Sequence, residues 1–433
     1  ILLKPMNDTG SQVIVNGEVI GTMAAKEYFS FKKSLVPQIK SAYNTLAAEH
    51  QIIVIEGAGS PAEINLKEND IVNMGMAQIA DSPVLLVADI DRGGVFAQLY
   101  GTIELLEKDE RARIKGLIIN KFRGDKSILD SGIKMIEEKT GIPVVGTVPY
   151  LNIQLDDEDS LSENLHTFTK FRDKADEIQI AIVRLPHISN FTDFIPLQNH
   201  GAVNVYYVQS PEDFGVPDCV IVPGTKNTLD DLEWLKKTGC AEFIQKEAEK
   251  GTVIVGVCGG FQILGKKITG SETEGSSECA LDALGLLPVE TEFYAKKTRT
   301  RVSGKVEISD VLQNLRISGY EIHQGQTRFL DQNEASYFAK ITDSVTGQVK
   351  YDGAVKGSVF GTYIHGLFDE SEFTNQFMQI LAERKGFDLQ KNDGYAKKSL
   401  TLHDFKETQY NLLADTLRTH LDMKKIYKIM GIS

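Results

Sequence analysis

The chain has 433 residues, of which 42% are hydrophobic and 25% charged, so we expect a soluble globular protein with two domains rather than one core. No apolar run is long enough to cross a bilayer, the start lacks a signal peptide, and the four cysteines show no disulfide or metal spacing. These features indicate a cytoplasmic protein without membrane contact, and the net charge of −13 argues against nucleic-acid binding.

Strand and helix patterns alternate through the first 150 residues. A possible hairpin turns at Asn16-Gly17, and a helical region follows over residues 24–49. Four short apolar runs are then predicted to be buried strands: 52–55, 84–88, 116–119 and 143–146. This alternation is typical of a parallel, doubly wound α/β sheet, which binds ligands at the carboxyl ends of its strands.

Polar residues follow three of these predicted strands. Glu56 comes after the first and precedes a Gly-Ala-Gly loop. The others follow the second and third strands: Asp89, Asp91 and Arg92, then Asn120 and Lys121. Their position predicts a ligand site, although solvated loop residues are the alternative for each.

An acidic, polar stretch at 156–164 is the predicted linker, giving domains at 1–165 and 166–433. A second α/β series follows, with strands at 178–183, 203–208, 219–222 and 252–257. The pattern then becomes richer in strands, including 303–308 and 359–363. From about Glu370 it is typical of helices with charged faces.

Cys258 lies between a buried strand and a helical pattern, with glycines at 256, 259 and 260. Small neighbours allow a strained turn that presents one side chain, and the helix N-terminus stabilises a thiolate. We therefore interpret Cys258 as a nucleophile, against the alternative of a buried structural cysteine.

A thiolate nucleophile needs a base and donors for the developing oxyanion. The strand at 359–363 delivers His365, which we interpret as the base rather than a solvated or capping histidine. Backbone N–H groups of Gly259 and of the loop at Gly224 are the candidate oxyanion donors.

Three motifs resemble the class I glutamine amidotransferase domain, which has a flavodoxin-like fold: Gly-Val-Cys-Gly-Gly-Phe-Gln-Ile-Leu-Gly (256–265), Val-Pro-Gly-Thr-Lys-Asn-Thr (222–228) and Tyr-Ile-His-Gly-Leu-Phe (363–368). The resemblance implies that Cys258 attacks glutamine, that His365 activates it, and that Gln262 and the Gly224 loop hold glutamine. The class usually carries a glutamate two residues after the histidine, where this chain has Leu367. The cobyrinate branch of the class also lacks that glutamate, so the group that orients His365 is left unidentified.

Two further stretches resemble the cobyric acid synthase family: Leu-Pro-His-Ile-Ser-Asn-Phe-Thr-Asp-Phe (185–194) and Ser-Gly-Tyr-Glu-Ile-His-Gln-Gly (318–325). Either could take part in the site or hold a domain interface. Members of that family would use ATP and glutamine to amidate carboxylates of a corrinoid, adenosylcobyrinic acid a,c-diamide, giving adenosylcobyric acid in cobalamin synthesis. The alternatives are a cobyrinic acid a,c-diamide synthase, a cell-wall precursor amidase, or a non-catalytic or glutaminase-only subunit that needs a partner ATPase.

Amidation requires an activated carboxylate, which ATP and Mg²⁺ can provide. We expect Glu56 to hold Mg²⁺, and Asn120-Lys121 resembles the base-reading element of dethiobiotin-synthetase-like ATPases. Asp89, Asp91 and Arg92 are candidates for Mg²⁺ or substrate. Further candidate cations for substrate carboxylates are Lys4, Lys67 and Arg123, for which surface charge is the alternative.

The family's phosphate-binding Gly-Lys-Ser/Thr loop is missing from the sequence. The nearest match, at 260–267, ends in lysine and lies after Cys258. Because the chain starts at Ile1, we expect an incomplete ATPase domain, and residues 1–433 alone are expected to show neither tight Mg·ATP binding nor ATP-dependent amidation.

Overall fold

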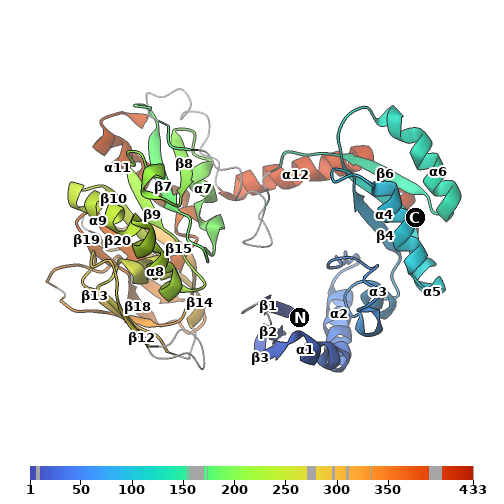
Figure 1. The fold of residues 1–433 in the computed structure, drawn as a ribbon, viewed down its shortest axis with the longest axis horizontal. Helices are drawn as coiled ribbons and strands as arrows, with labels where there is room; N and C mark the ends of the chain where they lie inside the picture. Colours follow the sequence, from blue (N-terminus) through green and yellow to red (C-terminus); the bar gives the residue numbers. More distant parts are fainter. Residues whose placement is uncertain are drawn as a thin grey trace. The chain divides into compact units, whose positions relative to one another are not determined.

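The computed structural model describes residues 1–5, 10–153, 155, 170–172, 174–270, 279–294, 298–308, 312–331, 333–389 and 402–432. The linker predicted at 156–164 lies outside these residues. The chain forms two compact units, shown in Figure 1: Ile1–Ile153 with Gln409–Ser433, and Gln154–Thr408. Each unit is an α/β assembly, as predicted.

The first unit begins with a three-stranded antiparallel sheet, β1 (Leu2–Pro5), β2 (Gly10–Val15) and β3 (Glu18–Ala24). The predicted hairpin joins β2 to β3, with Asn16 and Gly17 both at positive φ. The predicted helical region becomes α1 (Ala25–Phe31) and α2 (Val36–Glu49), linked by a short 3₁₀ turn.

The first unit also contains a three-stranded parallel sheet of order β4-β5-β6. Figure 1 labels β4 and β6 of this sheet. Its strands are Val84–Asp89, Ile114–Phe122 and Val144–Pro149, which confirms three of the four predicted strands. Buried side chains of β5 pack with those of two neighbouring helices, α4 (Val95–Leu105) and α6 (Asp130–Thr140). Two short helices complete this unit, α3 (Met74–Ile79) and α5 (Lys108–Arg111).

The fourth prediction, a buried strand at 52–55, is wrong. These residues form no strand in the structure, and Val54 is 90% exposed. A β-branched run becomes a strand only where a neighbouring strand takes its backbone hydrogen bonds, and no strand of the described chain pairs with it.

The C-terminal helices α12 (Leu402–His420) and α13 (Met423–Ile429) were assigned to the second domain from sequence. In the structure, residues from Gln409 onward belong to the first unit. Leu421 pairs with Gly146 on the edge strand β6, and the Asp422 N–H donates to the Val145 carbonyl at 2.7 Å. Because a Cβ at Gly146 would lie 2.5 Å from the carbonyl oxygen of His420, only glycine permits this close approach. The segment thus covers an edge of the sheet.

The second unit contains a six-stranded sheet of order β19-β20-β10-β9-β7-β8, in which all strands except the edge strand β19 are parallel. Five predicted strands are confirmed in this sheet, those at 178–183, 203–208, 219–222, 252–257 and 359–363, and the first three have the predicted bounds. The strands are β7 (Ile178–Val183), β8 (Val203–Val208), β9 (Cys219–Val222), β10 (Val253–Val257), β19 (Ala354–Lys356) and β20 (Val359–Thr362). Its helices are α7 (Ile195–Gln198), α8 (Thr228–Thr238), α9 (Cys240–Lys250), α10 (Gly259–Leu264) and α11 (Ser371–Lys385).

The strand-rich part of this unit forms two further sheets. One has the order β18-β17-β14-β15-β21, with β14 at Thr298–Val306, β15 at Arg316–His323, β17 at Ala339–Asp343, β18 at Val349–Asp352 and β21 at Ile364–His365. The other consists of β11 (Lys267–Gly270), β12 (Cys279–Asp282), β13 (Val289–Glu292) and β16 (Gln326–Phe329). The chain passes from the six-stranded to the five-stranded sheet at Tyr363, so His365 lies at their junction.

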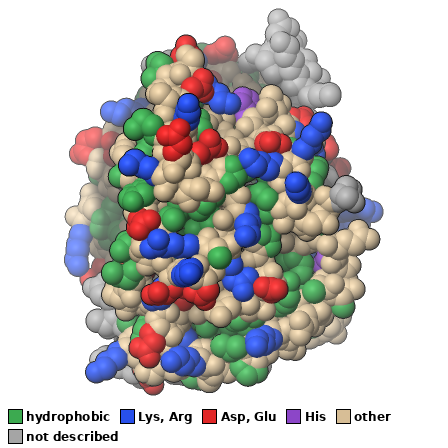
Figure 2. Space-filling model, turned by 90° about the vertical axis from the view of Figure 1, so that its right-hand side faces the viewer, with side chains coloured by type: hydrophobic (Ala, Val, Ile, Leu, Met, Phe, Trp, Pro, Cys, Tyr) green, Lys and Arg blue, Asp and Glu red, His purple; other side chains and the backbone are tan. Residues whose placement is uncertain are grey.

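The chain has a net charge of −13 but also carries 47 lysine and arginine residues. Figure 2 shows lysine and arginine side chains interspersed with acidic ones over one face, so local cations exist on an acidic protein. Among the helices of the described residues, none is both long enough and apolar enough to cross a membrane.

Candidate active site

Cys258 lies at the turn between β10 and α10, as predicted from its glycine neighbours. Its φ of 53° is unusual for a residue with a side chain and shows that the turn is strained. A Cβ on Gly260 would lie 1.9 Å from the carbonyl oxygen of Val222, so the glycine lets α10 approach β9 closely. The Cys258 N–H donates to the Thr362 carbonyl at 2.8 Å, which ties the turn to β20.

His365 is buried and is held by a carboxylate that the sequence analysis did not identify. Its Nδ1 lies 2.7 Å from Oδ2 of Asp193, and the next backbone N–H, that of Gly366, donates to Oδ1 at 3.0 Å. Asp193 is itself buried and comes from the stretch at 185–194. One carboxylate therefore fixes both the ring and the backbone of His365, while Leu367 is an apolar core residue.

The structure brings Cys258 and His365 together. Burial by itself lowers the pKa of His365, but the charges of Cys258 and Asp193 and the hydrogen bond to Asp193 outweigh it and raise that pKa. Nε2 of His365 is buried without a hydrogen-bond partner. The Tyr320 ring stacks on the imidazole, with centroids 5.2 Å apart, and the Asn190 side-chain amide donates to the Tyr320 hydroxyl at 2.6 Å. The arrangement favours a protonated imidazole beside Cys258.

The loop at Gly224 approaches both members of this pair. A Cβ on Gly224 would lie 3.1 Å from Cε1 of His365, and the backbone nitrogen of Thr225 lies 3.2 Å from where a Cβ of Gly259 would be. The backbone of Thr225 therefore lies close to that of Gly259, the residue after Cys258. An oxyanion site needs two backbone N–H donors beside the nucleophile, and these two residues remain the candidates for them.

Gln262 makes three internal hydrogen bonds. Its amide nitrogen donates to the Gln324 carbonyl at 2.9 Å and to the Tyr363 hydroxyl at 3.2 Å, and its oxygen accepts from Thr228 at 3.2 Å. In this structure the side chain braces α10 against its surroundings.

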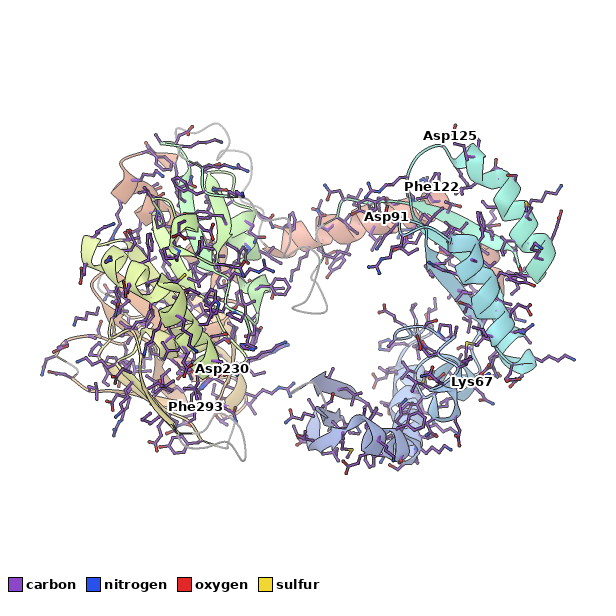
Figure 3. All side chains as sticks on the ribbon, in the orientation of Figure 1. Lys67, Asp91, Phe122, Asp125, Asp230 and Phe293 are labelled. Carbon is purple, nitrogen blue, oxygen red and sulfur yellow. The ribbon has the colours of Figure 1, made fainter. Side chains whose placement is uncertain are left out.

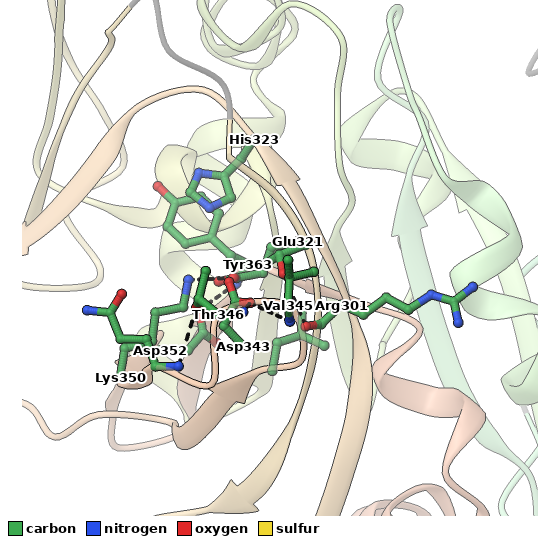
Figure 4. Close-up of polar contacts among 12 residues, drawn as sticks. Arg301, Glu321, His323, Asp343, Val345, Thr346, Lys350, Asp352 and Tyr363 are labelled. Atoms are coloured by element: carbon green, nitrogen blue, oxygen red, sulfur yellow. Dashed lines mark hydrogen bonds and ion pairs between the residues drawn. The ribbon is translucent and has the colours of Figure 1, made fainter. Parts of the chain in front are cut away.

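A cluster of buried acidic groups supports the strand that carries His365 (Figure 4). Asp352 accepts from the Thr362 hydroxyl and, at 3.1 Å, from the Tyr363 N–H. Its burial raises the pKa of Asp352 to about 7. Buried Glu321 is paired with Lys350 at 2.5 Å. The contacts of Asp352 fix Thr362 and Tyr363. Thr362 holds the Cys258 N–H through its carbonyl, and His365 follows two residues after Tyr363.

The stretch at 318–325 runs along the same centre. A Cβ on Gly319 would lie 2.1 Å from the His365 carbonyl oxygen, so glycine allows β15 to pair closely with β21. The Ile322 carbonyl accepts from the Cys258 thiol at 3.7 Å. Both stretches whose role the sequence left open therefore contact the cysteine–histidine pair directly.

In the first unit, Asp89, Asn120 and Lys121 meet at the carboxyl edge of the parallel sheet. Asp89 is paired with Asn120 in register, and its carboxylate lies 2.8 Å from Nζ of Lys121. The hydrogen bond from Lys121 outweighs burial and lowers the pKa of Asp89, with smaller contributions that include the charge of Arg92. Asn120 and Lys121 lie within β5 rather than after it, because the strand extends beyond the predicted bound at 119.

Asp91 and Arg123 form a second ion pair at this edge. Oδ1 of Asp91 lies 3.0 Å from Nε of Arg123, whose guanidinium lies 3.4 Å from the centre of the Tyr150 ring. Figure 3 labels Asp91, which follows β4, and Phe122, which ends β5. Lys67, also labelled there, is paired with Glu110 at 2.8 Å, and the side chain of Lys4 lies outside the described residues.

Glu56 is exposed in an irregular segment rather than at a strand end. The adjoining loop is fixed by Asn73, whose amide donates to the Ala58 carbonyl at 2.8 Å. Within the described residues, no three potential metal ligands of the His, Cys, Asp and Glu types gather at one point. Mg²⁺ usually takes only one or two protein carboxylates together with phosphate oxygens and water.

Comparisons with known proteins agree with this description. Residues 179–373 match the CobB/CobQ-like glutamine amidotransferase domain, and residues 19–158 match an AAA domain. A cobyric acid synthase of Alkaliphilus metalliredigens is 47% identical over 438 residues, covering 99% of this chain and 85% of that protein. One of Ruminiclostridium cellulolyticum is 46% identical, covering 99% and 82%. A solved glutamine amidotransferase aligns with 47% of this chain and 98% of its own at 17% identity and a TM-score of 0.35, which is too low to carry an argument.

The domain matches and the cysteine–histidine site define the class as an amidotransferase with an attached nucleotide-binding-type domain, and both predicted domain types are confirmed. The chain belongs to the cobyric acid synthase family, and it is therefore an enzyme of the ligase type.

Proposed function

We propose that the protein uses ATP and glutamine to amidate peripheral carboxylates of adenosylcobyrinic acid a,c-diamide, giving adenosylcobyric acid. The observation that carries this proposal is the buried Cys258–His365–Asp193 arrangement in a chain of the cobyric acid synthase family. Such an arrangement suits release of ammonia from an amide. Cytoplasmic location is part of the same proposal, in keeping with the free thiols of Cys219, Cys240 and Cys258.

In the glutaminase half, the Cys258 thiolate attacks the side-chain amide carbon of glutamine. The N–H groups of Gly259 and of the Gly224–Thr225 turn stabilise the oxyanion, and protonated His365 donates its proton to the departing ammonia. Water then hydrolyses the thioester to glutamate, with His365 accepting the proton. Asp193 holds the ring so that Nε2 is the nitrogen available for these transfers. Gln262 contributes by fixing the position of α10.

In the synthetase half, ATP phosphorylates a substrate carboxylate, and ammonia displaces phosphate from the acyl phosphate to give the amide. We propose that Glu56 contacts Mg²⁺ and that Asn120 and Lys121 contact the nucleotide. Asp89, Asp91 and Arg92 would bind Mg²⁺ or the corrinoid. Their closeness at one sheet edge supports this assignment, since ligands of parallel α/β sheets bind there.

Labelled nitrogen tests the overall reaction. This assay and the amidation assays below use the chain extended by its native upstream segment, because residues 1–433 alone are expected to lack ATP-dependent amidation. With [amide-¹⁵N]glutamine, Mg·ATP and the a,c-diamide, we expect each new corrinoid amide to carry ¹⁵N, as measured by mass spectrometry. Formation of glutamate without any amidated corrinoid would instead favour a glutaminase-only subunit. Amidation of a different carboxylate substrate, with none on the corrinoid, would favour one of the related amidases.

Replacing Glu56 with glutamine is expected to lower ATP-dependent amidation at least about 100-fold, even with saturating ammonium, because a metal contact contributes several kcal/mol to phosphoryl transfer. Glutamine hydrolysis should remain. The matched control is Glu63→Gln, which removes another exposed carboxylate from the same irregular region. Normal turnover of the Glu56 variant at limiting Mg²⁺ would show that the metal contact lies elsewhere.

A further inference from the structure

A second histidine–aspartate pair lies beside the proposed glutaminase centre. Nδ1 of His187 is 2.8 Å from Oδ1 of Asp231, in the same relation that His365 has to Asp193. The Asp231 side chain is completely buried, whereas that of His187 is 46% exposed. Asp231 lies in the first turn of α8, which follows the Gly224 loop directly.

Asp231 joins two loops. Its Oδ2 accepts from the Thr225 hydroxyl at 2.5 Å, and the backbone N–H of His187 lies 3.3 Å from both carboxylate oxygens. Two backbone hydrogen bonds join the same two loops. The Lys226 N–H donates to the His187 carbonyl at 2.9 Å, and the Ser189 N–H donates to the Gly224 carbonyl at 2.8 Å. The carboxylate is therefore one side-chain link between the stretch at 185–194 and the Gly224 loop; the Thr225 hydroxyl, 3.2 Å from the His187 carbonyl oxygen, is another.

Thr225 also contacts the turn that carries Cys258, at Gly259. Its Cγ2 lies 2.6 Å, and its backbone nitrogen 3.2 Å, from where a Cβ of Gly259 would be. A small shift of Thr225 would move its backbone N–H, one of the two proposed oxyanion donors, relative to Gly259 and Cys258. An oxyanion donor acts through its position relative to the developing charge, so such a shift would affect the reaction more than the binding of glutamine.

A buried carboxylate is costly unless its oxygens are satisfied. Asp231 meets this condition by accepting from three donors, and the N-terminal end of α8 also favours its negative charge. Asparagine has only one acceptor oxygen and could not serve both loops in the same way. We propose that Asp231 is a positioning residue that holds Thr225, and with it the oxyanion donor, against Gly259. The proposal rests on the glutaminase function proposed above.

Kinetics of glutamine hydrolysis by the whole protein test this inference. Asp231→Asn and Thr225→Val are each expected to lower kcat about 10- to 100-fold, less than the outright loss of one oxyanion donor, while KM changes less than about threefold. Thr225→Ser keeps the hydroxyl and should lose less than Thr225→Val. The matched control is Asp230→Asn on the same helix, where the neighbouring carboxylate is exposed and bonded to Asn227 (Figure 3); its kcat should be unchanged.

Alkylation of Cys258 by iodoacetamide separates positioning from a general loss of structure, because alkylation needs the thiolate but no oxyanion donor. The Asp231 and Thr225 variants should be alkylated at the wild-type rate. Unchanged kcat in both variants, or an equal loss of alkylation and hydrolysis, would overturn the inference. Wild-type protein and Cys258→Ser are assayed alongside, since hydrolysis that survives in Cys258→Ser would instead refute the glutaminase assignment itself.

Discussion

Serine in place of Cys258 is expected to abolish glutamine-dependent amidation while amidation with added ammonium continues. A serine hydroxyl is not ionised at neutral pH, so it cannot act as the thiolate nucleophile that the proposed mechanism requires of Cys258, the residue that precedes α10. We expect the glutamine-dependent rate to fall at least about 1,000-fold, in line with the removal of a nucleophile in other hydrolases. The measurement is the rate of amide formation with glutamine and, separately, with ammonium chloride.

The other buried thiols provide the control for this experiment. Cys240 is free and buried on α9, and its sulfur contacts the Gln209 carbonyl rather than the proposed site. Cys240→Ser should therefore keep both activities. If Cys258→Ser lost amidation with glutamine and with ammonium equally, the cysteine would support the structure or serve both reactions. That outcome would contradict the proposal that Cys258 acts only in glutamine hydrolysis.

Much of the second unit could be predicted because its strands are buried on both faces. Residues 178–183 are all buried in β7, and a run that is apolar except for Gln179 indicates such a strand clearly. The turn at Cys258 could also be predicted, because three neighbouring glycines lack the side chains that would clash in a tight turn. Both signals are local in the sequence.

Contacts between distant segments could not be predicted in this way. Asp193 precedes His365 by 172 residues, and no spacing rule links them. The pairing of Leu421 with Gly146 likewise joins distant residues that no spacing rule links, and it places the C-terminal segment with the first unit. Residues 52–55 show that a local signal can also mislead. Their composition favours a strand, but a strand forms only where a neighbouring strand pairs with it, and these residues form none.

Asp193→Asn is expected to lower the rate of glutamine hydrolysis about 1,000- to 10,000-fold, as expected when a catalytic histidine is held in the wrong tautomer. In the unsubstituted protein, Nδ1 of His365 lies 2.7 Å from the Asp193 carboxylate, which favours a proton on Nδ1 and leaves Nε2 for the reaction. An amide at the same place can present its NH₂ group and reverse that preference. Ammonium-dependent amidation should continue, which distinguishes this loss from unfolding.

The pH dependence of the same variant gives an independent test. The Asp193 charge is among the causes that raise the pKa of His365, so its removal should lower that pKa. Because protonated His365 is the proposed donor to the leaving ammonia, activity should then be lost at a lower pH. The alkaline limb of kcat/KM against pH is therefore expected to move to lower pH in Asp193→Asn. A wild-type rate with an unmoved alkaline limb would show that another group orients the imidazole.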